Sequence, residues 1–171
     1  MPFFKNPTYL LFCFAVVILL SGFAPAQSKT EILTEDALKK VVPSSFYFAG
    51  QSAETQARNT AAARIGENRL VIVGLVDTSG YSTEISGKYE GFFITDSRIS
   101  LGGKILNTGA YGFGFTKGTT INIFDLSSKQ ILSVKTISDS EIKRPRPLMM
   151  IGDDKSVRLY KGKDYVSISA K

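Results

Sequence analysis

From residue 70 to the C-terminus, short apolar runs alternate with clusters of Gly, Asp, Ser and Lys, which is the pattern of β-strands joined by tight turns. Strands are predicted over residues 70–76, 89–95, 110–116, 120–126, 130–136, 148–151, 157–160 and 165–168, with a small hairpin over 99–106. Short strands at this spacing predict one mainly β (or β-rich α+β) domain over residues 27–171, either a small sandwich or a partly closed barrel.

The segment before residue 70 is less uniform. Residues 34–42 predict a short helix, because Thr34 can cap it, acids occupy its first turn, lysines occupy its last, and Pro43 follows it. The aromatic residues 46–48 predict a strand or a hydrophobic plug. Residues 52–64 are compatible with a helix, because they are rich in alanine, or with the first arm of a hairpin, and the two alternatives stay open.

The first 26 residues have the organisation of a secretory signal peptide. Lys5 supplies the positive charge, residues 9–20 form an unbroken apolar run, and Ala24-Pro25-Ala26 matches the small-x-small cleavage pattern. The run is shorter than the roughly 20 residues that a membrane span needs, which favours cleavage after Ala26 over a retained anchor. We expect an exported protein, periplasmic or extracellular, with a flexible start over residues 27–33.

The amino-acid composition excludes several kinds of chemistry. The chain has no histidine, and its one cysteine, Cys13, lies inside the predicted signal. Catalytic Ser-His-Asp and Cys-His sets, thiolate metal sites and His-ligated metals are therefore excluded, and we expect no cofactor or metal. Phe23 stands where a lipoprotein requires cysteine, so no lipid anchor is expected. The net charge of +6 favours solubility, or contact with anionic envelope components, over binding of nucleic acid.

One motif is compatible with hydrolysis. Residues 75–80, Leu-Val-Asp-Thr-Ser-Gly, resemble the hydrophobic-hydrophobic-Asp-Thr-Gly signature of aspartic proteases, and residues 149–152 resemble their second apolar element. Asp77 would be the catalytic carboxylate, and two chains would have to associate because this chemistry needs two carboxylates. Ser79 interrupts the signature, however, and a strand followed by a turn that begins at Asp77 accounts for the same residues.

A second candidate is the aromatic strand over residues 110–116. Side chains alternate between faces along a strand, so Tyr111, Phe113 and Phe115 share one face, while Gly112 and Gly114 leave the other bare. The bare face would admit a ligand, or the rings would form the floor of a binding site. The alternative is an aromatic core face with glycines where another element crosses the sheet.

A third candidate is the basic, proline-containing segment 143–147. Its cations, Lys143, Arg144 and Arg146, are held in an extended backbone by two prolines. They could contact an anionic surface or a partner protein, or form a solvated connector into the strand that follows.

Five segments together resemble a family of uncharacterised small exported bacterial proteins: FYFAGQSAETQARN, GLVDTSGYST, KYEGFFITDS, GAYGFGF and RPRPL, which begin at Phe46, Gly74, Lys88, Gly109 and Arg144. This resemblance implies export and no activity. We expect a non-enzymatic secreted or periplasmic β-domain that binds a partner or a small apolar ligand. The alternatives are an aspartic-protease-like hydrolase centred on Asp77 and a structural or assembly protein of the envelope.

Overall fold

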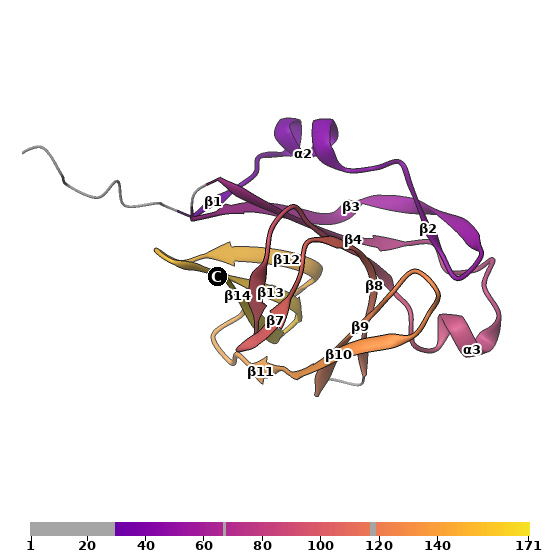
Figure 1. Ribbon diagram of the computed structural model, residues 1–171. Helices are drawn as coiled ribbons and strands as arrows, with labels where there is room; N and C mark the ends of the chain where they lie inside the picture. Colours follow the sequence, from indigo (N-terminus) through magenta and orange to yellow (C-terminus); the bar gives the residue numbers. More distant parts are fainter. Residues whose placement is uncertain (1–29, 67, 117–118) are drawn as a thin grey trace, which may run out of the picture.

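The computed structural model describes residues 30–66, 68–116 and 119–171, so the predicted signal peptide and Cys13 lie outside the described residues. Two antiparallel sheets form a β-rich fold that is not closed into a barrel, which confirms the predicted fold class (Figure 1). Of the two predicted architectures, the open arrangement of two sheets is the one observed.

The larger, eight-stranded sheet has the order β1-β3-β4-β5-β8-β9-β10, with β2 also paired to β3. Its strands are β1 (Glu31–Ile32), β2 (Ser45–Phe48), β3 (Gln51–Ile65), β4 (Arg69–Val76), β5 (Gly91–Thr95), β8 (Gly109–Thr116), β9 (Thr120–Phe124) and β10 (Gln130–Lys135).

The smaller, six-stranded sheet has the order β12-β13-β14-β6-β7, with β11 paired to β14. Its strands are β6 (Ile99–Leu101), β7 (Lys104–Leu106), β11 (Ile137–Ser138), β12 (Arg146–Gly152), β13 (Ser156–Gly162) and β14 (Asp164–Ala170). All the strands predicted from residue 70 onward are therefore present.

The main hydrophobic core lies between the two sheets. Alternate residues of the strands supply it, as the two-residue period of a β-strand requires. In β13, for example, Val157 and Leu159 are fully buried, and they belong to the same cluster as Phe93 and Phe113 of the larger sheet. This core is continuous from β3 to β14 and joins the two sheets into one body.

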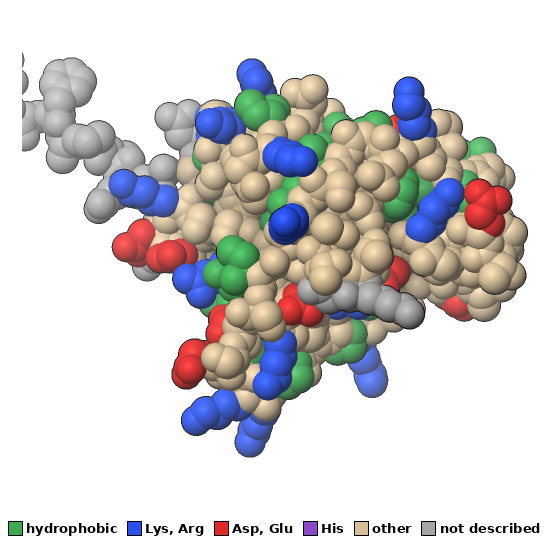
Figure 2. All heavy atoms as spheres, turned by 90° about the horizontal axis from the view of Figure 1, so that it is seen from below, with side chains coloured by type: hydrophobic (Ala, Val, Ile, Leu, Met, Phe, Trp, Pro, Cys, Tyr) green, Lys and Arg blue, Asp and Glu red, His purple; other side chains and the backbone are tan. Residues whose placement is uncertain are grey.

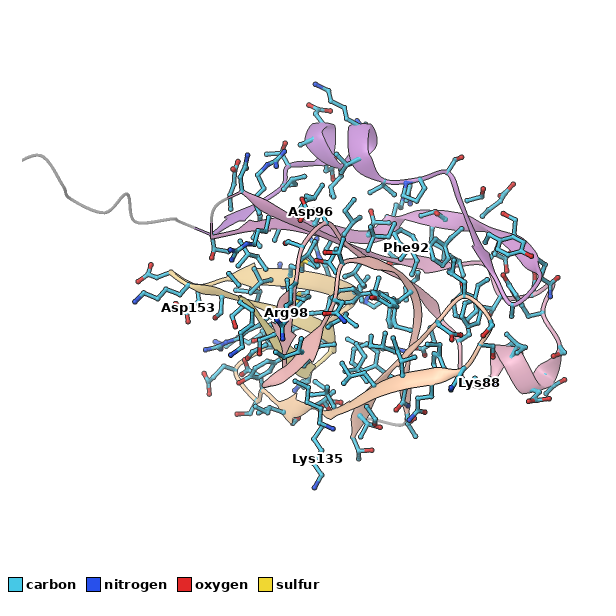
Figure 3. All side chains as sticks on the ribbon, in the orientation of Figure 1. Lys88, Phe92, Asp96, Arg98, Lys135 and Asp153 are labelled. Atoms are coloured by element: carbon cyan, nitrogen blue, oxygen red, sulfur yellow. The ribbon has the colours of Figure 1, made fainter. Side chains whose placement is uncertain are left out.

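A second core covers the opposite face of the larger sheet. Here β2 and the start of β3 turn over the sheet, so that Phe48 stacks on Tyr89 with ring centroids 4.0 Å apart and Phe46 stacks on Phe92 at 5.2 Å. Phe92 lies inside the molecule, whereas Lys135 points outward (Figure 3). The central strands of the larger sheet are therefore buried on both faces, which explains why β4 and β5 are almost continuously apolar rather than alternating.

Two helices accompany the sheets. The predicted helix is α2 (Glu35–Val41), although the side chain of its N-cap residue, Thr34, makes no capping hydrogen bond. The short α3 (Thr83–Ser86) was not predicted. Among the described residues, neither helix is long and apolar enough to cross a membrane.

The structure settles the ambiguous segment 52–64 as part of the long strand β3. Ala61 and Ala63 belong to the main core and Ala62 to the second, which is the alternation of a strand between two apolar layers. Near the N-terminus, residues 31–32 pair with β3 and Leu33 is buried. This part of the segment that we expected to be flexible is held against the sheet instead.

The outer surface carries charge in scattered positions. Figure 2 views the molecule from below, with basic side chains distributed over this face and hydrophobic side chains scattered between them. No single broad apolar patch stands out in that view.

Candidate ligand-binding groove

The candidate site begins with an irregularity in β3. Thr55 is opposite Val76 of β4 and Thr60 is opposite Gly74, so residues 56–59 bulge out of register with β4. Three side-chain hydrogen bonds hold the bulge: Gln56 donates to the Val76 carbonyl (3.0 Å), Asn59 donates to Gln56 (2.7 Å), and the Thr60 hydroxyl donates to the Ala57 carbonyl (2.8 Å). Bulges re-aim side chains and interrupt pairing, and this one bends β3 beside a hollow.

The other edge of β3 is also interrupted here. β2 pairs with the start of β3 and β1 with its end, and the chain between β1 and β2 leaves the sheet to form α2. The Thr55 amide donates to the Ser44 carbonyl and the Leu33 amide to the Ala62 carbonyl, both at 2.9 Å. Between these two hydrogen bonds, this edge of β3 has no paired strand, and the chain beside it forms α2 instead.

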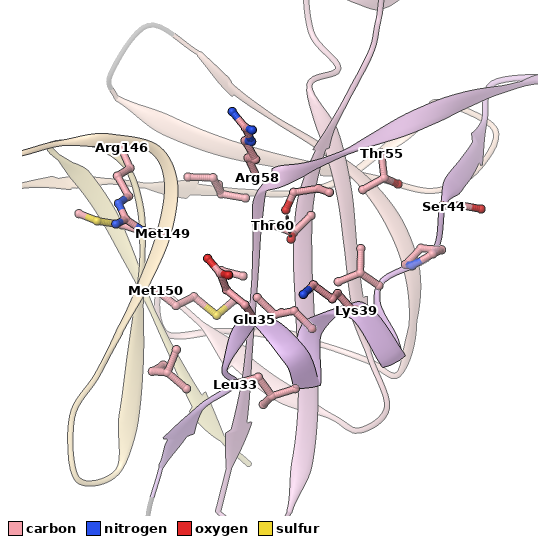
Figure 4. A pocket seen from close by; sticks show the side chains of 17 residues that line it. Leu33, Glu35, Lys39, Ser44, Thr55, Arg58, Thr60, Arg146, Met149 and Met150 are labelled. Atoms are coloured by element: carbon pink, nitrogen blue, oxygen red, sulfur yellow. Dashed lines mark hydrogen bonds between the residues drawn. The ribbon is translucent and has the colours of Figure 1, made fainter.

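A hollow of about 610 Å³ opens along this stretch, between α2, the bulged part of β3 and β12 (Figure 4). We call it the β3–β12 groove. It is lined by Ile32, Leu33, Glu35, Leu38, Lys39, Val42, Pro43, Ser44, Thr55, Ala57, Arg58, Thr60, Ala61, Arg146, Leu148, Met149 and Met150. Its volume lies within the range of small-molecule sites, which is roughly 300–1,000 Å³.

The lining is apolar at its base and charged at its rim. Leu33, Leu148 and Met150 are buried parts of the hydrophobic cores, whereas the charged lining residues are exposed. In Figure 4, Arg146 and Met149 of β12 lie across the opening from Glu35 and Lys39 of α2. The site therefore has a hydrophobic floor below a polar entrance.

The charges of the rim are unbalanced. Three cations, Lys39, Arg58 and Arg146, line the groove with one carboxylate, that of Glu35. Lys39 forms an exposed ion pair with Asp36 at 3.1 Å. Within the described part of the chain, neither Arg58 nor Arg146 forms an ion pair. Two guanidinium groups are thus available to an anion, and guanidinium binds carboxylate and phosphate well.

A second cleft, of about 630 Å³, adjoins the groove at Arg146 and is lined by Glu90, Phe115, Pro145, Arg146, Pro147, Lys161, Gly162 and Asp164. Glu90 is fully engaged: one carboxylate oxygen accepts the Lys161 ammonium and the other accepts the Phe115 amide at 2.9 Å. The Lys161 ammonium also lies 5.5 Å from the centroid of the Phe115 ring. These contacts tie β8 to β13 across the open end of the two sheets.

Asp77 does not have the environment of a protease carboxylate. It is exposed, and its Oδ1 accepts the amide of Ser79 at 3.0 Å, as in an ordinary Asp-initiated turn. The hydrogen bonds from Ser79 hold the pKa of Asp77 below its usual value. No other acid is hydrogen-bonded to Asp77 in the described ranges, and it lines neither the groove nor the cleft. The turn interpretation accounts for this motif.

The bare face expected along residues 111–115 is filled. A Cβ at Gly112 would overlap the Phe48 ring, and a Cβ at Gly114 would overlap the Lys88 carbonyl. On the opposite face, Phe113 is fully buried in the main core. This corrects the expectation of a ligand site on the strand, because Gly112 accommodates the Phe48 ring of the second core and Gly114 accommodates the Lys88 backbone.

The two remaining aromatic residues of the strand have different surroundings. Tyr111 packs against the main core and its hydroxyl donates to the Asn107 carbonyl at 3.1 Å. Phe115 is half-buried and lines the second cleft, whereas the other four predicted residues line neither the groove nor this cleft.

The basic segment is divided by the fold. Lys143 and Arg144 are exposed and line neither hollow, whereas Arg146, at the start of β12, lines both. Its position follows from the backbone: Arg146 is paired with Gly162, and β12 is out of register with β13 between residues 146 and 149. Of the candidates named from sequence, Arg146 is the one that the fold brings into the groove.

The described residues contain no group of three His, Cys, Asp or Glu side chains that could hold a metal ion. The comparisons with known proteins add no identity. No protein-family model, curated protein or solved structure matches this chain.

Sequence reasoning missed most of the groove. The sequence pattern places Leu38 and Lys39 on a helix without predicting a function for them, and Arg58 lies in the segment 52–64, for which helix and strand stay open. The sequence carries one signal, because residues 54–60 are polar except for Ala57, whereas the next three residues of the same strand are alanines. Such a break in the apolar pattern of a strand is compatible with a bulge, and the bulge is where the groove forms.

Proposed function

We propose that this protein is a non-enzymatic binding domain, and that the β3–β12 groove binds an amphiphile with an apolar chain and an anionic head group. The observation that carries this proposal is the combination of an apolar floor with three rim cations against one carboxylate. An apolar chain in the groove would cover Leu38, Ala61 and Met150, while its anion would contact the guanidinium groups of Arg58 and Arg146.

The floor suits an aliphatic chain. Met149 and Met150 are unbranched and adaptable, so they can follow an irregular apolar ligand. The hydrophobic contribution would be about 25 cal/mol for each Å² of apolar surface removed from water. The rim cations then determine the orientation of the ligand, because a charge interaction is specific while apolar contact is not.

The direct test measures binding of dodecanoate, below its micellar concentration, to the purified protein by calorimetry or by displacement of a fluorescent fatty acid. We expect Arg146→Gln to weaken dodecanoate binding about three- to tenfold, equivalent to roughly 0.7–1.4 kcal/mol. Arg144→Gln is the matched control, because Arg144 is an exposed arginine two positions away that lines neither hollow.

Three outcomes would count against the proposal. The unaltered protein could fail to bind dodecanoate, the neutral analogue dodecanol could bind equally well to all variants, or the two arginine variants could have the same affinity. The last two results would show that the rim cations do not select an anion.

We also propose export to the periplasm or the cell exterior, on the basis of the N-terminal sequence. The N-terminal sequence of the mature protein, recovered from the medium or the periplasm, tests this. A first residue of Gln27 is expected, and recovery of the intact chain from the cytoplasm would contradict it.

A further inference from the structure

The second cleft extends the proposed binding site beyond the groove. It shares Arg146 with the β3–β12 groove, so one exposed guanidinium lies where the two hollows meet. Pro145 and Pro147 restrict the backbone on either side of this arginine. Its partner across the ladder, Gly162, has no side chain, and nothing lies within 4 Å of the position that a Cβ would take there. Arg146 is therefore the residue common to both hollows, and no side chain stands opposite it in the ladder.

The charges beyond Arg146 change sign. In the cleft, Lys161 is already paired with Glu90, and both oxygens of Glu90 are engaged. Asp164 also lines the cleft, and within the described ranges its side chain has neither an ion pair nor a hydrogen bond. From the groove outward, a ligand thus meets an apolar floor, then an unpaired cation and then an unpaired carboxylate.

We infer that the ligand is a single-chain phospholipid whose head group carries an ammonium group. This inference rests on the proposed function of the groove. The acyl chain lies in the groove, the phosphodiester lies at Arg146, and the ammonium enters the second cleft towards Asp164. A fatty acid would supply only the apolar chain and an anion at Arg146. It has no ammonium group to enter the second cleft, because the molecule ends at its carboxylate. The wall of Phe115, Pro145 and Pro147 contacts the short carbon linker between phosphate and ammonium.

The test compares two amphiphiles with the same twelve-carbon chain, lysophosphatidylethanolamine and dodecanoate, each below its micellar concentration. The unaltered protein is expected to bind the lysophospholipid about five- to tenfold more tightly. Asp164→Asn is expected to remove this difference without weakening dodecanoate binding. Asp154→Asn is the matched control, because this exposed aspartate lies in the turn at the other end of β12 and lines neither hollow.

The outcomes separate the inference from the proposed function. If both amphiphiles bind with equal affinity, or if Asp164→Asn weakens both equally, the assignment of the head group is overturned while the anionic-amphiphile site stands. If a lysophosphatidylglycerol of the same chain length binds as tightly as the ethanolamine compound and is equally sensitive to Asp164→Asn, the ammonium is not the recognised group, and the inference fails. If none of the amphiphiles binds, the proposed function fails as well.

Discussion

Two glycines of β8 are positions where packing leaves no room for a side chain. Gly112 lies under the Phe48 ring, and Gly114 lies against the backbone carbonyl of Lys88. A phenyl ring can shift by rotation, but a carbonyl can move only with its chain. A side chain is therefore harder to accommodate at Gly114 than at Gly112, although the sequence pattern does not distinguish the two positions.

We expect Gly114→Ala to lower the free energy of unfolding by roughly 2–3 kcal/mol, because its Cβ would push the Lys88 backbone away from β8. Gly80→Ala is the control, since nothing lies within 4 Å of the position of its Cβ, and its change should be below about 1 kcal/mol. Denaturant unfolding of both variants measures the difference. Equal stability of the two would mean that β8 and the segment at Lys88 are not packed as described.

At the scale of secondary-structure elements, Asp139 links the segment that follows β11 to β13. One carboxylate oxygen accepts the hydroxyl of Tyr160 at 2.7 Å and the other accepts the amide of Glu141 at 3.0 Å, with Arg158 at 4.0 Å. The Tyr160 hydroxyl, followed by the Glu141 amide and the charge of Arg158, holds the pKa of Asp139 below its usual value. This carboxylate is thus stabilised in its ionised form by the fold.

A lowered pKa in the folded state means that the ionised carboxylate stabilises the fold above the pKa of the unfolded chain, which is near 3.8 for Asp139. This contribution is lost as the pH falls through the lower, folded-state pKa. We expect Asp139→Asn to reduce the melting temperature by a constant amount between pH 7 and pH 5, and the difference from the unaltered protein to shrink below about pH 4. Asn keeps only one of the two acceptor oxygens that Asp139 uses, so the part of the difference that shrinks at low pH is the part that tests the charge.

Thermal melts at several pH values measure this effect, with Asp154→Asn as a control in an exposed turn. A difference that stays constant down to pH 2 would contradict the role assigned to the charge of Asp139.

The strands were predictable because each is a local pattern. The apolar run 70–76 and the hairpin around 127–129 depend only on neighbouring residues and on turn chemistry. The bulge of β3 was not predictable, because it depends on Gln56 reaching the carbonyl of Val76, twenty residues away in sequence. The groove was missed for the same reason, since α2, β3 and β12 meet only in the folded chain.

At the scale of the whole molecule, the chain has an excess of basic residues, with 21 Lys and Arg against 15 Asp and Glu. The positive electrostatic potential that results raises the local concentration of anions around the protein, and it weakens as salt is added. The groove differs from the general surface because its cations stand above an apolar floor. Salt should therefore reduce the affinity for an anionic amphiphile without abolishing it.

We expect Glu35→Gln to strengthen dodecanoate binding about two- to threefold, because it removes the one carboxylate that lines the groove. The gain should decrease as sodium chloride is raised from 50 mM to 500 mM, where charges on an exposed rim are screened. Glu141→Gln, which removes an exposed carboxylate outside both hollows, should change the affinity less. Equal gains from the two variants would show that only the overall charge matters.

We propose that one groove, bounded by α2, β3 and β12, holds an anionic amphiphile. A crystal structure of the protein with dodecanoate bound would test this most directly. The bound chain is expected to lie over Leu38, Ala61 and Met150, with its carboxylate within hydrogen-bond distance of the guanidinium of Arg146 or Arg58. A dodecanoate chain located elsewhere on the protein, or one in the groove with its carboxylate turned away from both arginines, would refute the proposal.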